Sequence, residues 1–157
     1  MSAQVQTRSR YYIPALGGMF DRLSYYAWPV LRIVYGAWFI PHGMQKLFGV
    51  WGGNVQGVAK GIEGTVGLSP GIFWAYLIGC LEFFGGMLLV VGLFTRPVAA
   101  MFCIFMYVAS FHYNNQFGWW WTKGGMEMPL LLLGIAIAIL LRGGGEVSLD
   151  RRVGREF

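Results

Sequence analysis

The chain has 157 residues, of which 56% are hydrophobic and only 12% are charged. A soluble domain usually carries roughly 25% charged residues, and a chain this short cannot hide so much apolar surface in a single core. The composition therefore excludes an ordinary soluble domain and predicts a protein covered by lipid. Two cysteines are too few for an iron–sulfur cluster held by four thiolates.

The formal charge of +5 does not indicate a nucleic-acid partner, because the charges lie between apolar segments and form no stripe with aromatic residues. One set of predicted loops and tails carries Arg8, Arg10, Arg22, Arg96, Arg142, Arg151, Arg152 and Arg155, whereas the opposite set carries only Lys60 and Lys123. Positive charge concentrates on the cytoplasmic side of membrane proteins. We therefore expect a multi-pass protein of the bacterial inner membrane with both termini in the cytoplasm.

Residues 1–22 are polar and basic, which predicts a cytoplasmic tail. The membrane domain is predicted over residues 23–142, and its first span covers about residues 24–48. That segment is long enough for a hydrocarbon core that needs roughly 20 residues. Pro41 is expected to kink or open its outer end. The glycine-rich stretch that follows cannot span, but its apolar residues have helical spacing, which favours a short helix lying in the membrane interface.

Three further spans are predicted at about residues 71–94, 97–117 and 124–142. A tryptophan-rich connection precedes the last span, as is typical of helix ends at head-group depth. Residues 143–157 are expected to form a second cytoplasmic tail. The predicted fold is all-α: an antiparallel four-helix transmembrane bundle with a short interfacial helix between the first two spans.

Ionisable side chains inside the spans are the strongest indication of function, because each is costly in hydrocarbon unless it is paired. Arg32 and Lys46 share one face of the first span with two glycines. Glu82 lies in a similar seam of small residues on the second span. If these seams face each other, Arg32 and Glu82 form a buried ion pair, which either fixes the helix register or lines a path for a ligand or protons.

A second group consists of His42, Lys46, His112 and Glu127, which are expected at similar depth in the outer leaflet. Imidazole and ammonium groups can bond the carbonyl oxygens of a quinone, and a carboxylate or imidazole can exchange its protons. We therefore predict a quinone-headgroup cluster. The alternatives are that Lys46 snorkels, that Glu127 complements the start of its helix, and that the histidines have purely structural partners.

Other cofactors have less support in the sequence. A haem b held by His42 and His112 would rest on two histidines alone, so haem b is disfavoured. A metal site built from His42, His112 and Glu127 has equally little support, and we predict none. Cys80 and Cys103 are expected to differ in depth by about 12 Å, too far apart for a disulfide.

Several short motifs, in their order along the chain, resemble those of the DoxX family of small bacterial membrane proteins, over roughly residues 24–150. They are Arg32 and Gly36, His42-Gly43-x-x-Lys46, Glu82-x-x-Gly85-Gly86, Gly92-x-x-Thr95-Arg96, His112, Gly125-x-Glu127 and Gly143-x-Gly145-x-x-Ser148-Leu149-Asp150. Where family members often have Gly-Pro-Gly before the closing Ser-Leu-Asp, this chain has Gly143-Gly144-Gly145. The resemblance implies a setting in quinone-linked or thiol-stress redox complexes.

Two functions from different classes follow. The first is a membrane subunit of an oxidoreductase complex that interacts with the quinone pool, with other membrane or membrane-associated subunits as partners. The second is a non-catalytic structural or assembly subunit of a larger respiratory or photosynthetic complex. A small-solute carrier is disfavoured, because four short spans leave little room for a pathway. Whether the chain is itself an enzyme stays open in the sequence.

Overall fold

The computed structural model describes residues 11–154, which are helical and contain no strand. The α-helices are α1 (Pro14–Phe48), α2 (Val55–Gly61), α3 (Gly71–Cys80), α4 (Gly86–Val91), α5 (Thr95–Val108), α6 (Glu127–Arg142) and α7 (Leu149–Val153). Short 3₁₀ turns lie at η1 (Val50–Gly52), η5 (Asn114–Phe117) and η6 (Trp121–Lys123). Three π-helical segments are η2 (Ile62–Val66), η3 (Leu81–Gly85) and η4 (Ala109–Tyr113).

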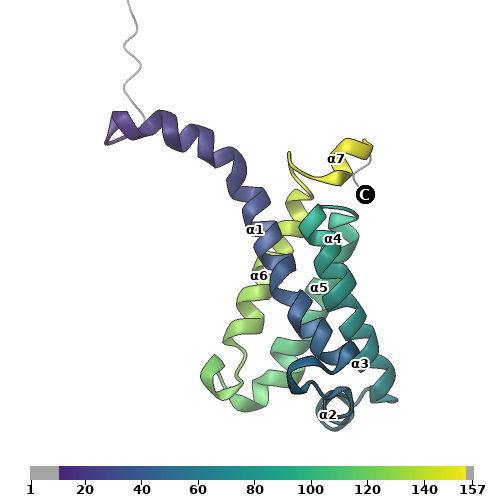
Figure 1. The fold of residues 1–157 in the computed structure, drawn as a ribbon. Coiled ribbons are helices and arrows are strands. Elements are labelled where there is room, and N and C mark those ends of the chain that lie inside the picture. The colour runs from purple at the N-terminus through teal and green to yellow at the C-terminus, as the bar shows by residue number, and fades with distance from the viewer. Residues whose placement is uncertain (1–10, 155–157) are drawn as a thin grey trace, which may run out of the picture.

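The longer helices pack side by side as rods (Figure 1). They are α1, the continuous run α3–η3–α4, α5 with η4, and α6, while α2 lies at the end of the bundle opposite α7. Within the described residues, one rod, Gly71–Val91, has the length and composition of a membrane span. The other crossings stay predictions, because α6 has only 16 residues and α1 carries several charges.

Helix α1 begins within the segment predicted as a polar tail. It starts at Pro14, and its first part runs away from the bundle at an angle to the remainder (Figure 1). Pro29 lies inside the helix, and an internal proline is a common cause of such a bend because it removes a backbone donor. The helix continues through Pro41 to Phe48 and ends at Gly49, whose φ of 67° needs the freedom of glycine. The predicted opening at Pro41 is therefore absent from this helix.

The small-residue seams predicted on the first two spans do face each other. A Cβ added at Gly36 would lie 2.5 Å from the carbonyl oxygen of Gly86, and one added at Gly43 would lie 2.5 Å from the backbone nitrogen of Phe83. These backbones approach each other more closely than any larger residue would allow. In lipid, where helix association gains little from expelling water, such close packing is a main source of stability.

An aromatic cluster fills the middle of the bundle. Tyr35, Phe39 and Phe102 are almost fully buried, and their ring centroids lie 4.6–5.6 Å apart. Leu89 of α4 and Ile139 of α6 are completely buried in the same cluster. Edge-to-face and tilted contacts of this kind add to the packing energy of the rings. The core thus joins all four rods, and it separates the two ends at which the polar groups lie.

Candidate functional site

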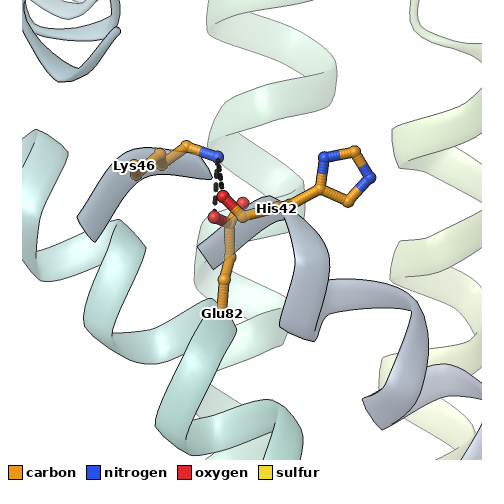
Figure 2. Close-up of polar contacts among 3 residues, drawn as sticks. All are labelled: His42, Lys46 and Glu82. Carbon is orange, nitrogen blue, oxygen red and sulfur yellow. Dashed lines mark hydrogen bonds and ion pairs between the residues drawn. The ribbon is translucent and has the colours of Figure 1, made fainter. Parts of the chain in front are cut away.

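The best-defined buried charge pair joins α1 to η3. The Nζ atom of Lys46 lies 2.6 Å from Oε2 of Glu82, with side-chain exposures of 16% and 4% (Figure 2). Lys46 Nζ also lies 3.4 Å from the carbonyl oxygen of His42, one turn earlier. Lys46 lies in the last turn of α1 and Glu82 is the second residue of a π-helical segment. π-Helical segments inside α-helices are rare overall, but those that occur are often found at functional sites. The position of Glu82 in such a segment therefore makes it a candidate functional residue.

The predicted ion pair between Arg32 and Glu82 is wrong. The two helices run antiparallel, and the contact of Gly36 with Gly86 fixes their register. Arg32 is therefore opposite Val90, to whose carbonyl oxygen its Nη2 donates at 3.5 Å. Lys46 is opposite Gly79, one turn from Glu82. Arg32 and Lys46 are separated by about 21 Å along α1, given a rise of ~1.5 Å per residue, so Glu82 can reach only one of them.

Arg32 instead binds the segment that follows α6. Its guanidinium donates to the carbonyl oxygens of Gly144 at 2.6 Å and Val147 at 2.8 Å, and the side chain is fully buried. The predicted C-terminal tail thus begins with a docked segment. Arg32 is a structural anchor of that segment.

The same segment caps the start of α5. The carboxylate of Asp150 accepts hydrogen bonds from the backbone nitrogens of Phe94 at 2.8 Å and Thr95 at 2.9 Å. Phe94 has a φ of 51°, which is uncommon for a residue with a side chain. Because Asp150 bonds the first amides of α5, it satisfies donors that the helix itself cannot and supports this turn. Within the Ser-Leu-Asp motif, Asp150 therefore caps a distant helix, whereas Ser148 caps α7 itself by accepting from the backbone nitrogen of Arg151.

A cavity of about 270 Å³ opens beside Lys46. It lies between the end of α1, the α2–η2 segment, α3 and the α5–η4 segment. Its polar lining residues are Lys46, Tyr113 and Asn114, and its apolar ones are Val58, Ile62, Val66, Ile78, Phe105, Val108 and Ala109. Two of the three π-helical segments, η2 and η4, contribute to this wall, and η3 holds the partner of Lys46. The cavity thus combines an apolar interior with a positively charged group held in place by a carboxylate.

The four residues predicted to form a quinone cluster do not make one connected group. Among the described residues, no hydrogen bond or ion pair joins any two of their side chains, and only Lys46 lines the cavity. The imidazole of His42 is exposed and points away from the Lys46–Glu82 pair (Figure 2). His112 is exposed, with its ring 5.9 Å from that of Tyr107. Glu127 accepts a hydrogen bond from the backbone nitrogen of Trp121 at 3.1 Å, so its carboxylate supports the turn that precedes α6.

Sequence reasoning missed Tyr113 and Asn114, and it gave Glu82 the wrong partner. A signal for the partner existed, because aligning the glycines of two antiparallel helices already places Glu82 nearer Lys46 than Arg32. By contrast, no feature of the sequence predicted where the π-helical segments occur. In the described part of the chain, no three His, Cys, Asp or Glu side chains gather in a way that could hold a metal ion. Cys80 and Cys103 are both free thiols.

Closely packed helical rods, one candidate membrane span and an ion pair beside a largely apolar cavity are features of a small helical membrane protein. The chain belongs to the DoxX family, whose sequence model matches residues 27–115. This match includes Arg32, Lys46 and Glu82. It ends before Glu127 and before the segment that Arg32 anchors.

The chain is also similar to a named bacterial protein. The chain is 31% identical over 121 residues to a Bacillus subtilis (strain 168) protein named "Putative oxidoreductase CatD". The alignment covers 77% of this chain and 82% of the relative. No solved structure matches the chain.

Proposed function

We propose that this protein is a membrane subunit of an oxidoreductase system and that the cavity beside Lys46 binds the ring of a quinone. The carrying observation is that Lys46, whose ammonium lies 2.6 Å from Glu82, lines a largely apolar cavity. The name of the Bacillus subtilis relative supports the redox setting. The partner that exchanges electrons with the quinone is a separate subunit in this proposal.

The cavity suits one substituted ring. Its volume of about 270 Å³ is slightly below the roughly 300–1,000 Å³ typical of pockets for drug-sized ligands. A larger flat cofactor such as haem b needs more room, and the exposed His42 and His112 do not line this cavity. Apolar walls with a few polar groups are also the usual lining of a site for a largely apolar ring.

Lys46 and Glu82 have different roles in the proposed binding site. Lys46 donates a hydrogen bond to a quinone carbonyl oxygen, and a charged donor makes such a bond stronger than a neutral one. Glu82 holds the ammonium in place, so little side-chain freedom is lost when the ligand arrives. Tyr113 and Asn114 are further polar groups of the cavity lining, and each can act as donor or acceptor.

The distribution of charge supports the orientation that we propose in a bacterial inner membrane. Arg96 follows the turn before α5, Arg142 ends α6, and Arg151 and Arg152 lie on α7, so these residues gather at one end of the bundle (Figure 1). The opposite end contains Lys60 on α2 and Lys123 in η6, besides Lys46, whose charge is paired with Glu82. By the bias of basic residues toward the cytoplasm, the end with α7 faces the cytoplasm. Lys46 and the cavity then lie near the outer leaflet.

A binding measurement tests the proposed site. The full chain is placed in quinone-free lipid nanodiscs, and a ubiquinone analogue is titrated while tryptophan fluorescence is followed. Replacing Lys46 with Met removes a charged hydrogen bond worth about 1.5–3 kcal/mol, so the affinity should fall at least about tenfold. The matched control Lys60→Met changes an exposed lysine outside the cavity and should leave the affinity unchanged.

Further variants separate this site from the cluster predicted from the sequence. His112→Ala and Glu127→Gln should bind the analogue as the wild type does, because neither residue lines the cavity. Loss of binding in these variants, with normal binding in Lys46→Met, would transfer the site to the predicted cluster. Absence of saturable binding by the wild type, together with co-purification in fixed ratio with a large complex, would support a structural subunit instead.

A further inference from the structure

A second, wholly apolar hollow lies between α3 and α5. Its volume is about 230 Å³. The residues that it does not share with the Lys46 cavity are Leu68, Trp74, Leu77, Leu81, Met101 and Ile104. Leu77, Met101 and Ile104 are 48%, 48% and 68% exposed, so the groove opens on the outer surface of the bundle. On a membrane protein this surface faces hydrocarbon.

The groove and the Lys46 cavity adjoin each other. They share Ile62, Val66, Ile78, Phe105 and Val108 in their linings. The combined lining is therefore more polar on the side of Lys46, Tyr113 and Asn114, and it is apolar on the side of the groove. A ligand that matches this gradient has a small polar ring joined to an apolar chain.

We propose that the groove between α3 and α5 holds the isoprenoid tail of the quinone whose ring binds beside Lys46, and that the ligand enters sideways from the bilayer. This inference rests on the proposed function. A long apolar tail cannot cross the aqueous phase without exposing its surface to water, so a membrane quinone needs an opening at membrane depth. The groove supplies such an opening next to a charged donor. The occupant is thus a tailed quinone, and a bilayer acyl chain is an outcome of the test.

The test compares two ligands and two aromatic substitutions on α3. The ligands are the ubiquinone ring without a tail and the same ring with a short isoprenoid tail, each titrated into the full chain in quinone-free nanodiscs. Leu77→Trp places a large side chain in the groove. Tyr76→Trp makes a similar change at a neighbouring position that is 45% exposed and does not line the groove. Both side chains are exposed, so neither substitution introduces a larger side chain into the buried core.

We expect Leu77→Trp to weaken the tailed ligand about tenfold, the change given by displacing roughly two methylene groups from an apolar site. It should leave the tail-less ring unaffected, and Tyr76→Trp should change neither ligand. Ile104→Trp, on the α5 side of the groove, should act as Leu77→Trp does. Each affinity is compared with that of the wild type for the same ligand, so partition of the tail into lipid cancels.

The outcomes separate the two proposals. If both ligands bind and Lys46→Met weakens both, but Leu77→Trp and Ile104→Trp weaken neither, the groove holds only bilayer acyl chains and the tail assignment is overturned. If Leu77→Trp weakens both ligands equally, the groove is part of the ring site and the division into ring and tail positions is wrong. If the wild type binds neither ligand saturably, the proposed function fails, and the tail assignment fails with it.

Discussion

The ion pair between Lys46 and Glu82 gives the sharpest prediction about stability. The two side chains are only 16% and 4% exposed, so both are largely withdrawn from water. Glu82→Gln would leave the largely buried Lys46 ammonium without a counter-charge, and breaking a buried pair in this way costs about 3–5 kcal/mol. Replacing both groups, in Lys46→Met/Glu82→Leu, removes the charges together. Such apolar replacement of a whole pair is often neutral or even stabilising.

The free energy of unfolding can be measured by titrating purified protein in mixed micelles with sodium dodecyl sulfate and following helicity by circular dichroism. We expect Glu82→Gln to lose about 3–5 kcal/mol and the double variant to lose less than about 1 kcal/mol. Glu146→Gln, at a carboxylate that is 51% exposed, serves as the control and should change little. A double variant as unstable as Glu82→Gln would refute the reasoning, because the loss would then come from packing. The double variant should also lose binding of the quinone ring while remaining folded.

Two further predictions concern packing and capping, and the same unfolding assay checks both. Gly36→Ala places a methyl group 2.5 Å from the backbone oxygen of Gly86, so α1 and α4 must separate at a cost of about 1–3 kcal/mol. Gly134→Ala on α6 meets no atom within 4 Å and should cost nothing. Asp150→Ala removes two hydrogen bonds to the start of α5 and should cost about 1–2 kcal/mol, while Glu146→Gln on the same segment should not. Equal effects within either pair would contradict the contacts on which these predictions depend.

Much of the helical architecture could be predicted because it depends on local sequence. Glycine at Gly49 and Gly92 ends helices, and the alternation of apolar runs with polar turns marks the rods. The short helix between the first two rods was likewise visible in the spacing of its apolar residues, and the structure confirms it as α2. The boundary of α1 could not be predicted in this way. Its first turns are mostly exposed and contain Gly17 and Gly18, so neither packing nor helix propensity indicates from the sequence that the helix begins at Pro14.

The candidate site was harder to predict, because it depends on which residues face each other across helices. Lys46 was recognised from its position in an apolar segment, but its partner was not. His42, His112 and Glu127 were grouped by depth alone, and depth does not say in which direction a side chain points. The exposed imidazole of His42 in Figure 2 illustrates this difference.

By itself, the sequence determined the class of environment and the list of buried charges. Too few charged residues for the apolar content required a lipid covering, and every charge within an apolar run required a partner. Only the tertiary structure decided the partners. The contact of Gly36 with Gly86 sets the antiparallel register, which gives Glu82 to Lys46 and leaves Arg32 to the carbonyl groups near Gly144. Pairing is a property of two helices together, and a single sequence records only the order of residues along each one.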